Sequence, residues 1–185
     1  MFNRHSIRLQ GFDYSQDGLY FVTICTKNRK LLFGQIEKGE MILNEFGKIV
    51  ESVWESLPKR SPVVLDEFQI MPNHVHLILI IQSPAQTIHE SPHHRFIQRG
   101  DKRALLPQCI GYLKMNSSKQ INQYIRAHHN PIVRAHHDAP QQIFQRNYYE
   151  SIIRTEFDLN KIREYIKINP KIWDRDRNNT LRTIP

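Results

Sequence analysis

Several short stretches of the chain alternate hydrophobic with polar positions or are rich in β-branched and aromatic side chains, which is typical of β-strands. They are residues 19–26, 31–37, 40–43, 63–70, 74–81 and 143–154. Lys38–Gly39 predicts a turn between the second and third stretches, and Pro72–Asn73 predicts one between the fourth and fifth. The pattern therefore predicts two hairpins, with residues 19–26 as a central strand and residues 143–154 as the last extended segment.

Apolar side chains recur at helical spacing in three further segments. The first begins after Asn44, whose side chain can accept hydrogen bonds from the first free amides, and it stops at Pro58. The second runs from about residue 105 to 126. The third opens near Thr155 and ends before Pro170, because the residue before a proline disfavours helical geometry. These segments are expected to be the helices that cover the strands.

The connections between these elements are polar. Residues 83–103 and 127–140 lack apolar periodicity and predict mobile loops. Residues 175–185 form a charged tail, with Trp173 just before it as the expected anchor. Three histidine pairs suggest a second metal site, but the composition of their segments favours solvated loops. The pairs are His93 and His94, His128 and His129, and His136 and His137.

The chain of 185 residues is long enough for one domain with a hydrophobic core and too short for two ordinary domains. We expect a single domain over residues 1–185, with its core at about 12–174. No apolar run approaches the roughly 20 residues that cross a membrane, and no signal peptide is apparent, so a cytoplasmic protein is expected. Cys25 and Cys109 are too few for a disulfide framework and are interpreted as reduced thiols.

The charge balance points to a polyanionic partner. The formal net charge is +8, and residues 95–134 contain eight basic side chains against the single acid Asp101. Such a basic segment favours nucleic acid or acidic lipid as a partner, although a solvated basic surface gives the same composition.

Candidate chemistry begins at the start of the apolar stretch 74–81. Alternate side chains of a strand share a face, so His74 and His76 project to the same side and their ring nitrogens converge. Two imidazoles at this spacing are half of a metal site. The alternative is structural, with one imidazole packed in the core and the other hydrogen-bonded to the backbone. The motif needs a third ligand and a reactive group to carry a function.

The third predicted helix supplies both groups. Tyr165 and Asn169 stand four residues apart, which places them on one helical face. A phenol is a nucleophile once deprotonated, and an amide oxygen can be the third ligand of a hard ion such as Mg²⁺ or Mn²⁺. Taken alone, the pair is better explained by a partly buried tyrosine and a helix-capping asparagine.

The chain resembles the REP-associated tyrosine transposases, which belong to the single-tyrosine HUH transposases. The segments that carry the resemblance in order and spacing are residues 20–26, 71–76, 146–150 and 165–170, and the likeness extends over about 12–174. It implies an α+β fold with a ferredoxin-like antiparallel sheet and helices packed on one face. It also implies a DNA transposase that cuts and rejoins single-stranded DNA near hairpin-forming sequences.

By position, the resemblance makes His74 and His76 metal ligands, Tyr165 the catalytic nucleophile and Asn169 a third ligand, where insertion-sequence relatives often have glutamine. The implied cofactor is Mg²⁺ or Mn²⁺. The tyrosinate would attack the scissile phosphate and form a 5′-phosphotyrosine, leaving a 3′-hydroxyl that can rejoin without ATP. Insertion-sequence relatives act as dimers and some REP-associated ones as monomers, so a monomer or a homodimer is expected.

Further residues are expected to contact DNA. Basic side chains on the second helix and around the last strand are candidates for backbone phosphates or a hairpin stem, namely Lys114, Lys119, Arg146 and Arg154. Tyr148 and Tyr149 are rival nucleophiles without a partner at helical spacing, so base stacking or core packing is favoured for them. Phe144 stands where many relatives have tryptophan, which bears on DNA sequence preference.

Other functions fit the motifs less well. Histidine-triad hydrolases need a third strand histidine where this chain has Ile78, and two-histidine phosphoesterases need a second His-x-Thr or His-x-Ser element in a matching strand. The main alternative is a domesticated hairpin-binding protein that does not cleave DNA, which the same charge and fold favour.

Overall fold

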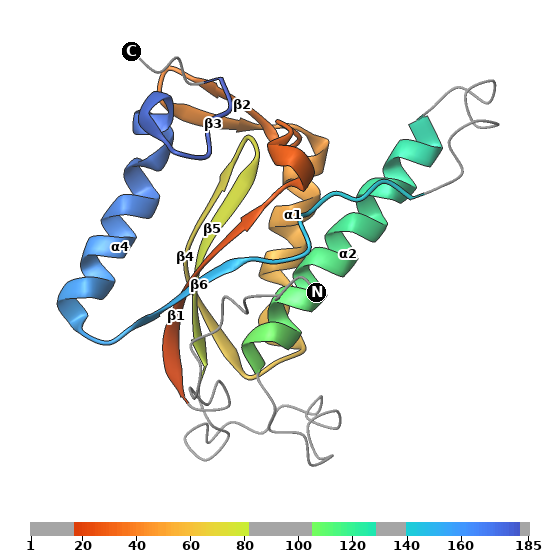
Figure 1. Ribbon diagram of the computed structural model, residues 1–185. Coiled ribbons are helices and arrows are strands. Elements are labelled where there is room, and N and C mark those ends of the chain that lie inside the picture. Colours follow the sequence, from red (N-terminus) through yellow and green to blue (C-terminus); the bar gives the residue numbers. More distant parts are fainter. Residues whose placement is uncertain (1–16, 82–104, 129–139, 182–185) are drawn as a thin grey trace, which may run out of the picture.

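The computed structural model describes residues 17–81, 105–128 and 140–181 (Figure 1). Its centre is a four-stranded antiparallel sheet in the order β4-β5-β1-β6. The strands are β1 (Gly18–Cys25), β4 (Val63–Met71), β5 (His74–Ile81) and β6 (Tyr149–Ile153), with a separate hairpin of β2 (Gly34–Glu37) and β3 (Glu40–Leu43). The α-helices are α1 (Glu45–Glu55), α2 (Leu105–His128) and α4 (Glu156–Ile168), and a 3-10 segment, Asn169–Arg175, follows α4. The predicted α+β class and antiparallel sheet are confirmed.

Two predicted caps position helices as expected. The Asn44 side chain accepts hydrogen bonds from the amides of Phe46 and Gly47 at 3.0 and 3.1 Å, which starts α1. Thr155 Oγ1 accepts from the Asp158 amide at 3.0 Å and starts α4. The chain therefore turns from β6 directly into the helix that carries Tyr165.

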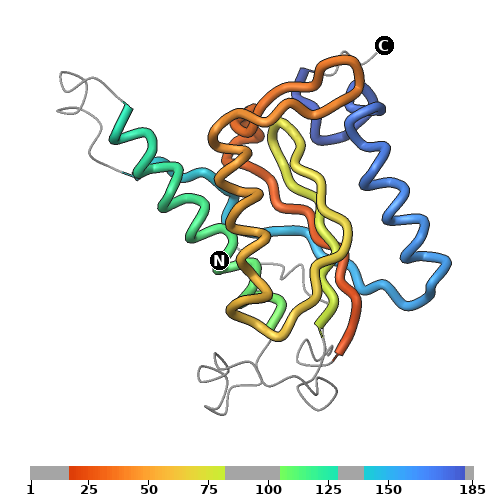
Figure 2. The backbone as a smooth tube through the Cα atoms, turned by 180° about the vertical axis from the view of Figure 1, so that it is seen from behind, coloured from red at the N-terminus to blue at the C-terminus, as the bar shows by residue number. Residues whose placement is uncertain are grey.

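The helices cover both faces of the sheet, which corrects the expectation that they pack on one face. Figures 1 and 2 show α1 and α2 on one side of the sheet and α4 on the other. The physical reason is that β5 is apolar on both of its faces. Leu77 and Leu79 pack in the core with α1 and α2, whereas Ile78 packs with Ile166 of α4.

The segment after α4 is more ordered than the sequence suggested. Trp173 is buried as the predicted anchor, and the following residues Asp176, Asn178 and Asn179 are buried as well. Cys25 and Cys109 are free. Within the described ranges, no helix has the length and apolar character needed to cross a membrane. Most of the two predicted loops and the end of the tail, residues 82–104, 129–139 and 182–185, lie outside the described residues.

Candidate metal centre

The two histidines of β5 form the centre of a buried polar cluster. His74 and His76 project from the same face of β5, and their Nε2 atoms lie 3.0 Å apart. The exposed fraction is 0% for His74 and 1% for His76. The predicted convergence of the two imidazoles is therefore confirmed, on the face of the sheet that α4 covers.

Asn73 fixes the tautomer of His74. The Asn73 amide nitrogen donates to the backbone oxygens of Arg29 and Asn178 at 3.2 and 2.7 Å, so its oxygen must face the other way. That oxygen lies 2.9 Å from His74 Nδ1, which must then carry the proton of a neutral imidazole. His74 Nε2 is left with a free lone pair directed into the cluster, as in a metal-ligating histidine.

His76 is oriented by a hydroxyl on the neighbouring strand. Thr23 of β1 stands opposite His76 in the sheet register, and Thr23 Oγ1 lies 2.9 Å from His76 Nδ1. The His76 ring also stacks against Phe21, with ring centroids 5.4 Å apart. These contacts point His76 Nε2 toward His74 Nε2.

Both imidazoles are neutral at physiological pH. Burial lowers the pKa of His74 to about 3, and the positive charges of Arg29 and Arg177 act in the same direction. Burial likewise lowers the pKa of His76 to about 3; the repulsion that a protonated His74 would exert adds to this effect, whereas the Asp176 carboxylate opposes it. Neutral imidazole is the form that binds a metal ion.

Asp176 completes a group that the sequence did not reveal. One ligand atom each from His74, His76 and Asp176 lie within 4.8 Å of one another, and the Asp176 carboxylate approaches His74 Nε2 to 3.9 Å. Asp176 is 6% exposed. No motif spacing could have identified Asp176, because the chain after α4 turns back and brings it to β5. The only indication in the sequence was the expected anchor Trp173, three residues before Asp176. A cluster of two imidazoles and a carboxylate could hold a metal ion.

Of the predicted pair, Tyr165 lies on α4 and faces this cluster, whereas Asn169 is the C-cap residue of α4 and begins the following 3-10 segment. The Tyr165 hydroxyl lies 3.4 Å from His76 Nε2, and the two rings meet edge to face. Burial raises the pKa of the Tyr165 phenol and the Asp176 carboxylate raises it further, whereas the adjacent Asn169 amide and the charge of Arg177 lower it.

Asn169 is fully buried, and within the described part of the chain its amide makes no hydrogen bond of good geometry, although it lies near enough to the Tyr165 phenol to lower its pKa. A buried amide without a partner is costly unless it binds an ion or ligand. The cluster therefore fits a divalent metal, because two neutral imidazoles with converging Nε2 atoms and a carboxylate lie in one buried site, and the buried Asn169 amide lies beside the Tyr165 phenol that faces it.

Most of the predicted DNA-binding residues lie elsewhere. Lys114, Lys119, Arg146 and Tyr148 line a groove of about 870 Å³ between α2 and residues 140–148. Arg126 also lines it, and none of the described residues that line it is acidic. Lys114 already donates to the backbone oxygens of residues 145 and 146 at 2.7 and 2.8 Å, so it holds this segment on α2.

The structure separates the other two predicted DNA-binding residues from the groove. Arg154 follows β6 and is exposed. Tyr149 is 47% exposed, and the Arg177 guanidinium lies over its ring at 5.8 Å. Of the three histidine pairs, only His128 falls within the described residues, where it contacts the Tyr124 backbone oxygen of its own helix.

Comparison with known proteins identifies relatives. No family model matches the chain. An uncharacterized Haemophilus influenzae protein is 37% identical over 177 residues, covering 95% of this chain and 92% of the relative. A REP-associated tyrosine transposase solved with a REP hairpin gives a TM-score of 0.52 at 16% identity, covering 83% of this chain and 67% of that one. A Deinococcus radiodurans protein proposed to be a transposase gives 0.44 at 18% identity, covering 86% and 96%.

Proposed function

Because the chain belongs to the same family as the uncharacterized Haemophilus influenzae protein and has the fold of a REP-associated tyrosine transposase, we propose that it is a metal-dependent tyrosine transposase. Its substrate is single-stranded DNA next to a hairpin. The observation that carries the proposal is the position of the Tyr165 hydroxyl, 3.4 Å from His76 Nε2 at the edge of the buried His74, His76 and Asp176 group.

The metal ligands are His74 and His76 through Nε2, with Asn169 as the predicted third ligand and Asp176 as an additional one. When bound, Mg²⁺ or Mn²⁺ would polarise a non-bridging oxygen of the scissile phosphate and offset the charge that develops there. Asn73 and Thr23 hold the two imidazoles in the orientation that this role requires.

Tyr165 is the nucleophile of the proposed reaction. Its phenol oxygen, after losing its proton, forms a bond to phosphorus while the bond from phosphorus to the 3′ oxygen breaks. The 5′ end of the DNA is then joined to Tyr165 and the other product ends in a 3′-hydroxyl. A 3′-hydroxyl that attacks the phosphotyrosine reverses these changes, and because one phosphodiester replaces another, rejoining needs no ATP.

The groove beside α2 is the proposed docking surface for the hairpin. Lys119, Arg126 and Arg146 bring positive charge to a groove whose described lining residues include no acid, which suits the phosphate backbone. The groove is lined by α2, whereas Tyr165 belongs to α4, and Figure 1 shows these two helices on opposite sides of the sheet. Residues 144–149 run between them, and exposed Tyr149 is placed to stack on a base of the connecting single strand.

A hairpin-binding protein that does not cleave is the second candidate. It is supported by the burial of His74, His76 and Asn169, none more than 1% exposed, since a scissile phosphate needs access to these groups. The groove and its charge serve this function equally well.

Incubation with end-labelled hairpin DNA and Mn²⁺, followed by a denaturing gel, separates the two functions. The transposase gives a covalent protein–DNA adduct that Tyr165→Phe abolishes. Tyr148→Phe and Tyr149→Phe are the matched controls, and both keep the adduct. Hairpin binding without an adduct, across substrates with varied flanking single strands, would establish the non-cleaving protein instead. An adduct that survives Tyr165→Phe would refute the nucleophile.

A further inference from the structure

β4 has an irregularity directly beneath α4. Its register with β5 shifts between Leu65 and Phe68, so that Asp66 and Glu67 together stand opposite the single residue Ile78. This is a β-bulge, in which an extra residue changes the direction of side chains. Ile78 packs in the cluster under α4, so the bulge brings two successive carboxylates to the side of the sheet that α4 covers.

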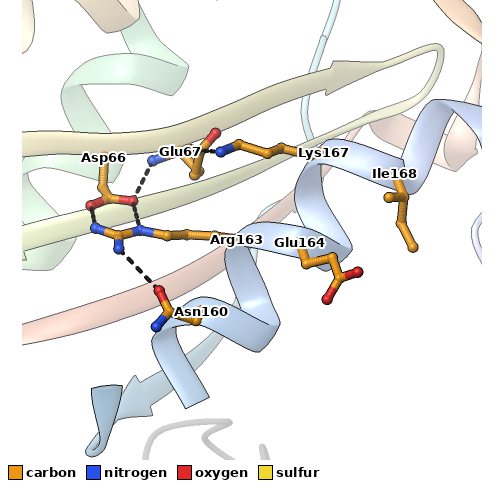
Figure 3. A pocket seen from close by; sticks show the side chains of 7 residues that line it. All are labelled: Asp66, Glu67, Asn160, Arg163, Glu164, Lys167 and Ile168. Carbon is orange, nitrogen blue, oxygen red and sulfur yellow. Dashed lines mark hydrogen bonds and ion pairs between the residues drawn. The ribbon is translucent and has the colours of Figure 1, made fainter. Parts of the chain in front are cut away.

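Both carboxylates are paired with cations of α4 (Figure 3). Arg163 donates two hydrogen bonds to the Asp66 carboxylate, from Nε to Oδ1 at 2.8 Å and from Nη2 to Oδ2 at 2.5 Å. Lys167 Nζ lies 2.7 Å from Glu67 Oε1. The side chains of the Asp66–Arg163 pair are 11% and 34% exposed, whereas those of the Glu67–Lys167 pair are 27% and 63% exposed. The bidentate and less exposed Asp66–Arg163 pair is therefore the stronger of the two.

Besides these ion pairs, α4 contacts the sheet through an apolar cluster to which Leu159, Ile162 and Tyr165 contribute while partly buried. Within α4, which is described over its whole length, Ile166 is the only buried residue, and it packs with Ile78 and Ile153. Arg163 and Lys167 stand two residues before and after Tyr165. The position of the phenol is therefore set by this apolar contact, by its ring contacts with Phe21 and His76, and by the two ion pairs that flank it in sequence.

We propose that Asp66 and Arg163, assisted by Glu67 and Lys167, are positioning residues that hold α4 so that the Tyr165 phenol stays beside His76. The inference rests on the proposed function and adds to it, because none of these residues touches the scissile phosphate. A small displacement of a reacting atom costs a large factor in rate, about 100-fold for 1 Å. The bulge is thus part of the machinery for DNA cleavage.

The test compares Arg163→Gln, Asp66→Asn and the double variant with the wild type. The single-turnover rate of adduct formation, measured with Mn²⁺ and saturating hairpin DNA, is expected to fall about 10- to 100-fold in each single variant. The double variant is expected to be no slower than the slower single one, because both changes remove the same interaction. The dissociation constant for the hairpin stays unchanged, and Arg163→Lys, which keeps one contact, gives an intermediate rate.

Lys48→Gln is the matched control, since it removes another 2.7 Å ion pair, with Glu45 on α1, and it should leave the rate unchanged. Adduct formation at the wild-type rate in Arg163→Gln overturns the inference. A rate loss accompanied by an equal loss of hairpin affinity also overturns it, because that pattern indicates general unfolding.

Amide hydrogen exchange tests the attachment without DNA. In Arg163→Gln the amides of α4 are expected to exchange at least about 10-fold faster than in the wild type, while those of β1 keep their protection. Unchanged exchange in α4 overturns the inference. If the wild type forms no adduct, the proposed function fails, and the exchange result still decides whether the bulge holds α4.

Discussion

Replacing Asn73 by alanine should weaken both the fold and metal binding. The Asn73 side chain makes three hydrogen bonds, to the Arg29 oxygen at 3.2 Å, the Asn178 oxygen at 2.7 Å and His74 Nδ1 at 2.9 Å. At about 1 kcal/mol for each bond, the free energy of unfolding should fall by about 3 kcal/mol. Loss of the contact that orients a ligating imidazole should also weaken metal affinity about 10- to 100-fold.

Urea unfolding in EDTA measures the first effect, and calorimetric titration with Mn²⁺ of the folded variant measures the second. Asn116→Ala is the matched control, because the Asn116 amide donates to the Tyr112 oxygen one turn earlier in α2. It should lower stability by about 1 kcal/mol and leave metal affinity unchanged. If Asn73→Ala unfolds more easily yet binds Mn²⁺ as tightly as the wild type, the argument that Asn73 sets the tautomer of His74 is refuted.

Three further predictions follow from the site and the fold. Without metal, the free energy of unfolding should fall as pH is lowered from 6.5 toward 3. The pKa of His74 and His76 is about 3 in the fold and 6.5 when unperturbed, so the unfolded chain binds more protons over this range. A urea midpoint that does not change with pH over this range contradicts the prediction. Mn²⁺ at about 100 times its dissociation constant should add about 2.7 kcal/mol to the stability of the wild type and nothing to that of His76→Ala, as thermal unfolding would show. Gly47→Ala should lower the free energy of unfolding in urea by about 1–3 kcal/mol, because a Cβ at this position would lie 2.4 Å from the Phe33 backbone oxygen. An unchanged urea midpoint would contradict the close approach of Gly47 to Phe33.

Local sequence patterns predicted most of the helices and strands, because the formation of a helix or strand depends largely on residues that are neighbours in the sequence. Asn44 and Thr155 were readable as caps, since a cap acts within three residues of itself. The bulge in β4 was missed, although the sequence carries a trace of it: apolar residues at 63 and 65 are followed by 68 and 70, so the alternation loses its phase. The second face of the sheet was missed in the same way, since the apolar run 77–81 is typical of a strand covered on both sides.

The candidate site was predictable where spacing determines geometry. His74 and His76 share a face because of strand periodicity, and Tyr165 and Asn169 share one because of helical periodicity. Asp176 had no such relation to the histidines, because it reaches them through tertiary packing of the chain after α4. The same holds for the contact between Asn73 and Asn178, which are 105 residues apart in the sequence.

That long separation has a consequence for protein synthesis. The imidazoles of β5 leave the ribosome before Tyr165, Asp176 and the Asn178 backbone oxygen that holds Asn73. Chains fold from the N-terminus as they emerge, so the sheet can begin to form before the reactive centre exists. A nascent or truncated chain that ends before α4 has the two histidines without the tyrosine. Under the proposed mechanism, such a chain could not cut DNA.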